Sequence, residues 1–386
     1  MNILDKFFSL FSYDIGIDLG TANTLIFVKD KGIVIREPSI VAMHKKTKKL
    51  IAIGTEAKKM LGKTPPNILT IKPLRGGVIA DFDATSNMIS YYVQSIHDVG
   101  NILPLALSKP RVVIGIPSSV TEVQRRAVWE AALDAGAREA FLIEEPMAAA
   151  IGEGVSVFSS TGSMIVDIGG GTTEIAIISL GGIVVSKSLL IAGDEMDRVI
   201  AHSIRLRHGL VLGEKTAEDI KIKVGSAYEN KVKSQKSKVK SEDEDSKENK
   251  EDEGNPEDKV EIKEKEREKV AVVRGMDIET GLPKSLKITE VEVREALAPV
   301  ISDIIDGISD VIEDSPPELT NDILEHGILL TGGGSLLPGL DHLIVERTRI
   351  PVIRSDDPLT SVVRGTGKVL EDDSLLQRVK VIGGLK

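Results

Sequence analysis

Two short stretches of the chain repeat the same order of residue types. Residues 13 to 28 read YDIGIDLGTANTLIFV, and residues 164 to 180 read MIVDIGGGTTEIAIISL. In each stretch an apolar run leads to Asp, a spacer residue, Gly, small hydroxyl-bearing residues and a second apolar run. This pattern predicts a strand, a tight turn and a second strand. Asp18 and Asp167 hold equivalent positions in the two copies.

These residue types suit the binding of a polyphosphate. Backbone N–H groups that converge in a tight turn bind anions, and Gly leaves the backbone accessible. Asp18 and Asp167, each at the end of a strand, are suited to hold Mg²⁺ directly or through water. Hydroxyl donors come from Thr21, Thr24, Thr172 and Thr173. A single glycine turn is more often only a turn, but two copies predict that a polyphosphate is held from both sides of a cleft.

Other phosphate motifs are absent from the sequence. Neither hairpin contains the G-x-x-x-x-G-K-[ST] order, and the segment after each turn reads as a strand rather than a helix, which argues against a dinucleotide-binding fingerprint. A third glycine cluster, GILLTGGGSLLPGL at 327–340, predicts a strand, three glycines and a helix that begins at Ser335. This bare backbone either admits a flat ring and its sugar or is simply a tight strand-to-helix turn.

The length and composition predict a multidomain α/β protein. With 386 residues, two or more domains are expected, and strands alternate with helices in both halves of the chain. A net charge of −10 and an aromatic content of 3% argue against nucleic acid as a partner. The chain has no cysteine, no apolar run long enough to span a bilayer and no positively charged leader with a cleavage site. The mostly charged residues 230–269 are expected to be disordered.

Several motifs together resemble a known family. DLGTANT, LIEEPMAAAIG, DIGGGTTE, AEDIK and LTGGGSLLPGL, in that order, are similar to the actin-like ATPase superfamily. GGVIADFDAT, GIPSSVTEVQRRAV, GAREAFLIEEPMAAAIG and DDPLTSVVRGTGKVLE more specifically resemble the MreB family of bacterial shape-determining actin homologues. The resemblance covers nearly the whole chain. It departs from the family pattern at the charged insert and at Ser335, where Ala is more usual.

The resemblance implies an actin-like fold, with two related α/β domains around a nucleotide cleft and a smaller subdomain on each. The implied organisation begins with an N-terminal amphipathic helix at 1–12 and a first domain at 13–155, whose small subdomain is 34–74. A second domain follows at 156–354, with its small subdomain at 197–284 and the insert at 230–269. A C-terminal segment at 355–386 packs back on the first domain.

The resemblance also implies the residues that hold ATP and Mg²⁺. The first phosphate loop matches Thr21, Ala22 and Asn23, and the second matches Gly170, Gly171, Thr172, Thr173 and Glu174. The segment that contacts ribose and base matches Glu218, Asp219, Ile220 and Lys221, and the adenosine turn matches Gly332, Gly333, Gly334, Ser335 and Leu336. Asp18 and Asp167 match the carboxylates that hold Mg²⁺, which we expect to act through water.

Two residues are expected to take part in hydrolysis. By resemblance, Glu145 positions or deprotonates the attacking water, and Thr172 is a second hydrogen-bond partner of that water. The alternative is that Glu145 is only a carboxylate favoured at a helix N-terminus, a role for which Glu144 is equally suited.

The first residues of the chain predict contact with a membrane surface. Apolar side chains form one stripe of a helix: Ile3, Leu4, Phe7, Phe8 and Phe11. We expect this stripe to lie in the membrane interface, although a terminal helix that packs on the core is the alternative. The apolar loop at 99–107 would add insertion area if it lies on the same face, and its alternative is a partly buried connection between helices.

The implied function is a slow ATPase that polymerises beneath the inner face of the cytoplasmic membrane. The implied partners are other copies of the chain, cell-wall synthesis proteins and shape-determining membrane proteins. A DnaK-type chaperone would need a further substrate-binding domain, and a sugar kinase would need a general-base Asp for which we find no motif. A non-enzymatic scaffold is the weakest alternative, because both hairpins retain Asp.

Overall fold

A computed structural model describes residues 13–98, 109–228 and 269–381. The predicted N-terminal helix at 1–12, the whole of the apolar loop at 99–107 and all but the last residue of the insert at 230–269 lie outside the described residues. Within the described ranges, no helix has the length and hydropathy needed to cross a bilayer.

The first large sheet has five strands. Their spatial order is β10 (Glu139–Glu144), β9 (Arg111–Ile116), β1 (Ile15–Leu19), β2 (Asn23–Val28) and β3 (Gly32–Pro38). The first three strands in chain order form an antiparallel meander, and β9 and β10 extend the sheet in parallel from β1.

The second large sheet repeats this topology. Its order is β13 (Gly182–Leu189), β12 (Thr173–Ser179), β11 (Ser163–Ile168), β17 (Ile328–Thr331) and β18 (Val352–Arg354). Again the first three strands are antiparallel and the last two are parallel to the first. The prediction of an α/β protein with two related halves is therefore confirmed.

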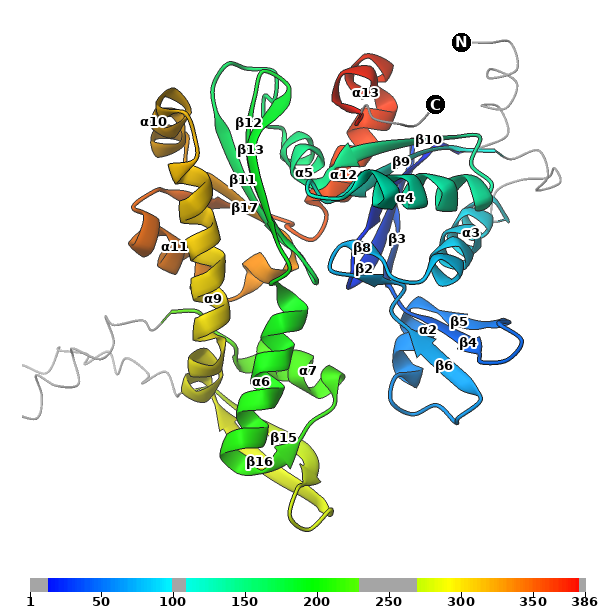
Figure 1. The fold of residues 1–386 in the computed structure, drawn as a ribbon, viewed down its shortest axis with the longest axis vertical. Coiled ribbons are helices and arrows are strands. Elements are labelled where there is room, and N and C mark those ends of the chain that lie inside the picture. The colour runs from blue at the N-terminus through cyan, green and yellow to red at the C-terminus, as the bar shows by residue number, and fades with distance from the viewer. Residues whose placement is uncertain (1–12, 99–108, 229–268, 382–386) are drawn as a thin grey trace, which may run out of the picture.

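Helices pack on both sheets, and Figure 1 shows the resulting two lobes side by side. The first sheet is accompanied by α3 (Phe82–Asp98), α4 (Glu122–Asp134), α5 (Glu145–Glu153), α12 (Ser361–Glu371) and α13 (Asp373–Val379). The second is accompanied by α9 (Glu290–Glu313), α10 (Pro317–His326) and α11 (Leu340–Thr348). The predicted capping box is present at the start of α4, where the side chains and backbones of Thr121 and Gln124 bond reciprocally.

Each lobe carries a smaller unit, and both units lie below their large sheets in Figure 1. The first unit contains β4 (Val41–His44), β5 (Leu50–Ile53), β6 (Ile68–Ile71) and α2 (Gly54–Met60). The second contains β14 (Leu210–Val211), β15 (Val270–Asp277), β16 (Pro283–Thr289), α6 (Gly193–His208) and α7 (Glu214–Val224). The short strands β7 (Leu74–Arg75) and β8 (Val78–Ile79) form a separate hairpin.

Helices α5 and α12 pack closely beside the point where the chain passes between the lobes. Helix α12 also packs on β1, β9 and β2 of the first sheet. A Cβ atom added at Gly152 would overlap the carbonyl oxygen of Ser361, and one added at Gly365 would overlap the carbonyl oxygen of Ala148. Glycine is needed at both positions because the two helix backbones touch there.

This packing predicts a large loss of stability in Gly365→Ala. The added methyl group meets backbone, which cannot move aside as a flexible side chain would, so we expect a melting temperature lower by about 5 °C or more. Differential scanning fluorimetry measures this. The matched control is Gly182→Ala, where the nearest atom to the new Cβ is 4.0 Å away. Equal melting temperatures for the two variants would contradict the close helix contact.

Candidate functional site

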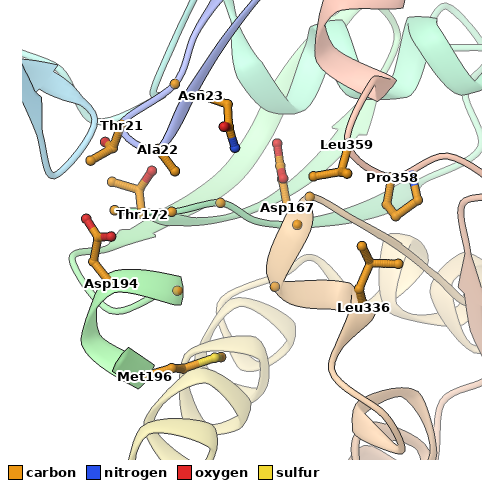
Figure 2. A pocket seen from close by; sticks show the side chains of 18 of the residues that line it. Thr21, Ala22, Asn23, Asp167, Thr172, Asp194, Met196, Leu336, Pro358 and Leu359 are labelled. Carbon is orange, nitrogen blue, oxygen red and sulfur yellow. The ribbon is translucent and has the colours of Figure 1, made fainter. Parts of the chain in front are cut away.

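A cavity of about 400 Å³ opens between the two lobes. Figure 2 shows Thr21, Ala22 and Asn23 on one side of it, with Asp167 and Thr172 facing them from the other lobe. Most of the residues predicted from the sequence line this cavity: Asp18, Thr21, Ala22, Asn23, Glu145, Asp167, Gly170, Gly171, Thr172, Glu218, Lys221, Gly332, Gly333, Gly334 and Leu336. The topology therefore brings both hairpins, the start of α5 and the third glycine cluster to one place.

The two glycine hairpins touch each other. A Cβ atom at Gly170 would lie 2.5 Å from the Cβ of Ala22, and one at Gly171 would lie 2.6 Å from Oγ1 of Thr21. Neither glycine has a positive φ. Glycine is therefore required here for the approach of the opposite hairpin rather than for an unusual backbone conformation.

A third segment, missed by the sequence reasoning, completes this contact. The backbone N–H of Gly77, in the turn between β7 and β8, donates a 3.0 Å hydrogen bond to Oγ1 of Thr21. A Cβ atom at Gly77 would meet Pro117 at 2.6 Å and the methyl group of Thr172 at 3.0 Å. The only signal in the sequence was the Gly76–Gly77 pair, and both residues have positive φ.

The opposite end of the cavity is formed by α6, α7 and the third glycine cluster. Lys221 Nζ donates a 2.8 Å hydrogen bond to the carbonyl oxygen of Gly193 and forms an ion pair with Asp197. Gly332, at φ 80°, leaves no room for a side chain beside the carboxylate of Asp167. Other lining residues that sequence reasoning missed are Gly20, Leu25, Gly169, Asp194, Met196, Ile222, Leu337, Pro338, Pro358, Leu359 and Val362.

Five of the predicted ligand-contact residues do not line the cavity: Thr173, Glu174, Asp219, Ile220 and Ser335. Alternation along β12 turns Thr173 away, and its hydroxyl donates to the carbonyl oxygen of Ile191. Ile220 lies in the hydrophobic core, and Ser335 is buried with its hydroxyl bonded to the carbonyl oxygen of Gly332. Motif matching selects runs of consecutive residues, whereas only some members of each run point toward the cavity.

Asp18, Asp167 and Glu145 all line the cavity, and each of these carboxyl groups has a raised pKa. Burial raises the pKa of Asp18 to about 7. Burial, with the charges of Asp18 and Glu174, raises that of Asp167 to about 8. Burial also raises the pKa of Glu145 well above its ordinary value, and the charges of Glu174, Asp18 and Asp167 add to the effect. Negative charge is therefore concentrated where a cation would relieve it.

The carboxylates at the cavity fit an Mg²⁺ ion that takes most of its oxygen ligands from water and phosphate rather than from the protein. Among residues 13–98, 109–228 and 269–381, no three acidic or histidine side chains converge closely enough to hold a metal ion directly. Mg²⁺ keeps several waters and is commonly held by one or two carboxylates plus substrate phosphates. Asp18 and Asp167 are the residues that would hold it.

The raised pKa values predict how the nucleotide-free protein responds to pH. Between pH 4 and pH 8 the folded state binds more protons at Asp18 and Asp167 than the unfolded state, because the ordinary pKa of Asp is 3.8. Stability from these groups is therefore greatest at low pH and falls as pH rises. We expect the melting temperature measured without Mg²⁺ and nucleotide to fall from pH 5 to pH 8.

Asp167→Asn tests the origin of this slope. The amide has nearly the same shape but no charge, so the variant should lose much of the fall in melting temperature between pH 5 and pH 8. Asp303→Asn, at an exposed carboxylate on α9 that does not line the cavity, is the control and should keep the slope of the wild type. The same slope in all three proteins would show that other groups control the pH dependence.

Comparison with known proteins gives the family. The model of the MreB/Mbl protein family matches residues 12–258 and 258–378. The cell shape-determining protein MreB of Escherichia coli strain K12 is 45% identical over 373 residues, covering 96% of each chain. Mbl of Bacillus subtilis strain 168 is 41% identical over 372 residues, covering 96% of this chain and all of Mbl.

Solved structures agree with this result. MreB5 of Spiroplasma citri bound to ADP superposes with a TM-score of 0.80 at 33% identity, and the match covers 95% of this chain and 98% of that one. The MamK double helical filament, at 22% identity and a TM-score of 0.69 over 94% and 99% of the two chains, shares the fold. The predicted actin-like fold is confirmed, and the chain belongs to the MreB/Mbl protein family.

Proposed function

We propose that this protein binds ATP with Mg²⁺ between its two lobes, hydrolyses it slowly, and assembles into filaments at the inner face of the cell membrane that help to set cell shape. The observation that carries the proposal is the contact between the two glycine hairpins at the cavity. Relatives named as cell shape-determining proteins support it, as do Spiroplasma MreB5 structures bound to ADP and to AMPPNP.

In this proposal the hairpins bind the phosphates through backbone N–H groups. Thr21 and Thr172 approach from opposite lobes, so the β- and γ-phosphates are held only when the lobes are close together. Mg²⁺, when bound, neutralises phosphate charge. Asp18 and Asp167 would hold Mg²⁺ through water, and the cation would favour the charged form of both buried carboxylates.

Glu145 is the residue that accepts the proton of the attacking water. It begins α5 directly after β10, and its Cγ lies 3.5 Å from the position of a Cβ atom at Gly115 on the neighbouring strand. Burial raises its pKa, which makes the carboxylate a stronger base. The Thr172 hydroxyl, on the other lobe, holds the same water in line with the phosphate.

Ion pairs across the cavity mouth link ATP binding to the relative position of the two small units of the protein. Lys58 of α2 pairs with Glu218 of α7 at 2.8 Å, and Lys72 pairs with Glu214 at 3.2 Å and with Asp194 at 3.8 Å. These pairs join the two small units beside the cavity, which Asp194 and Glu218 line. Closure of the lobes on ATP therefore changes the relative position of surfaces that a filament would use.

Membership of the MreB/Mbl family favours a filament-forming ATPase over the two other activities considered for this superfamily, a chaperone and a sugar kinase. A DnaK-type chaperone and a sugar kinase would share the phosphate clamp but act as monomers. Light scattering separates these cases, because only a polymer gives a signal that rises with ATP above a critical protein concentration.

Glu145→Ala should uncouple assembly from hydrolysis. The variant lacks the base but keeps both hairpins, so we expect ATP binding and ATP-dependent light scattering to persist while phosphate release falls by about 100-fold. Phosphate release and light scattering are measured on the same samples of full-length protein.

Glu144→Ala is the matched control for this experiment. Glu144 precedes the helix and does not line the cavity, so its removal should leave phosphate release within about threefold of the wild type. If Glu145→Ala hydrolyses ATP normally, Glu145 is not the base. If the wild type neither scatters light nor releases phosphate with ATP, the proposed function is wrong.

Membrane association is proposed from the sequence of residues 1–12, which lie outside the described residues. Full-length protein should pellet with vesicles of phosphatidylglycerol and phosphatidylethanolamine, whereas residues 12–386 and Phe8→Glu should stay in the supernatant. Because Lys6 is the only basic residue of this stretch, pelleting should change little with salt. Equal pelleting of the full-length and shortened proteins would refute an N-terminal anchor.

A further inference from the structure

Glu174 is a buried carboxylate that joins the two lobes. It lies on β12 with 1% of its surface exposed. Its Oε2 accepts hydrogen bonds from the backbone N–H of Ser118 at 3.1 Å and from the hydroxyl of Ser118 at 2.7 Å. Its Oε1 accepts a hydrogen bond from the hydroxyl of Ser188 on the neighbouring strand β13. Ser118 follows β9 of the first lobe, so the carboxylate links the lobes.

The link lies beside the residues proposed to handle the attacking water. Pro117, which precedes Ser118, and the methyl group of Thr172 both contact Gly77. On the other side, Ile116 pairs in register with Glu144, the residue before Glu145. The turn after β9, which Glu174 binds at Ser118, is therefore connected to Thr172 through Gly77. It is connected to Glu145 through the last residue of β10.

Glu174 makes no ion pair with a cation in the part of the chain that the structure describes, and it does not line the cavity. Burying a carboxylate without a counter-ion is costly, and hydrogen bonds from three donors offset that penalty. An apolar side chain would fill the same space without this penalty. The carboxylate is therefore suited to a task that needs directed bonds between the lobes.

We propose, on the basis of the function above, that Glu174 is a positioning residue for ATP hydrolysis: through Ser118 it fixes the first lobe against the second hairpin and so sets Glu145 and Thr172 on either side of the water. The two groups belong to different lobes, so their separation depends on the contacts between the lobes. A displacement of about 1 Å can lower a rate by about 100-fold. Glu174 acts on the catalytic step and not on the affinity for ATP.

Glu174→Ala and Ser118→Ala test the link from both ends. Glu174→Ala removes all three hydrogen bonds, so kcat for phosphate release should fall by about 10-fold or more, while the KM for ATP stays within about threefold of the wild type. Ser118→Ala keeps the N–H bond and loses the hydroxyl bond, so its kcat should fall less. If Glu174→Ala fails to fold, the kcat of Ser118→Ala still tests the link.

Glu174→Gln should restore most of the activity. Its amide oxygen can face both donors of Ser118, and its NH₂ group can donate to the hydroxyl oxygen of Ser188, which then acts as the acceptor. All three contacts survive. The lost charge also helped to raise the pKa of Glu145, but Glu174→Ala loses it too, so we expect kcat for Glu174→Gln to exceed that of Glu174→Ala several-fold and to approach that of the wild type. If Glu174→Gln is as slow as Glu174→Ala, the hydrogen-bonded link is not what sets the rate, and the proposal is overturned.

Ser179→Ala is the matched control. Ser179 lies on the same strand and is also buried, but its hydroxyl donates to the carbonyl oxygen of Ser160 within the second lobe. Its removal should lower the melting temperature without lowering kcat. A fall in melting temperature with unchanged kcat in Glu174→Ala would reduce Glu174 to a structural residue and overturn the proposal.

Two further results are decisive. A raised KM with unchanged kcat in Glu174→Ala would make Glu174 a ligand contact and would also overturn the proposal. Phosphate release by the wild type tests the proposed function separately, since the proposal about Glu174 concerns only the ratio of variant to wild type.

Discussion

The backbone contact between the two glycine hairpins is the constraint on which the rest of the structure depends. Gly170 and Gly171 of one lobe lie against Ala22 and Thr21 of the other, too close for any side chain in their place. A polyphosphate can be held from both sides only if two hairpins come this near. The equal topology of the two large sheets makes the approach possible, because each sheet places its first hairpin at the equivalent position.

The same approach concentrates negative charge. Asp18 and Asp167 end equivalent strands, so bringing the hairpins together also brings these carboxylates together, and Glu145 joins them from the start of α5. Burial and mutual repulsion raise the pKa of Glu145 and of Asp167. These carboxylates therefore oppose closure of the lobes by electrostatic repulsion, and in the proposed function bound Mg²⁺ and nucleotide would offset that repulsion. Binding of that ligand and the relative position of the lobes are thus linked by the same groups.

Local pattern predicted the α/β fold and the two hairpins of the cavity, and the family resemblance predicted lining residues such as Glu145, Glu218 and Lys221. The repeated strand–turn–strand signal implied the repeated sheet, and the glycine clusters marked the loops. Prediction of site residues from the sequence failed where the role of a residue depends on the direction of its side chain or on a tertiary contact. Glu174 was expected to contact the ligand with its neighbours, but its carboxylate accepts hydrogen bonds from Ser118 and Ser188 instead. Gly77 is distant in sequence, so only the folded chain shows that it contacts Thr21 and Thr172.

The two copies of the hairpin share a frame, and one of the positions at which they differ lies opposite the Asp of the first strand. Thr24 and Thr173 follow the turn in equivalent register, and each hydroxyl bonds to the segment near the end of its third strand. One residue further on, Asp18 pairs with Leu25 in the first copy, whereas Asp167 pairs with Glu174 in the second. An apolar residue suffices where the strand only fills space. The carboxylate of Glu174 belongs to the second copy. That copy faces the turn after β9 of the other lobe, and this turn lies next to the start of α5. The difference between the copies therefore falls where the two lobes must be held in one relative position, which is what a reaction divided between Glu145 and Thr172 requires.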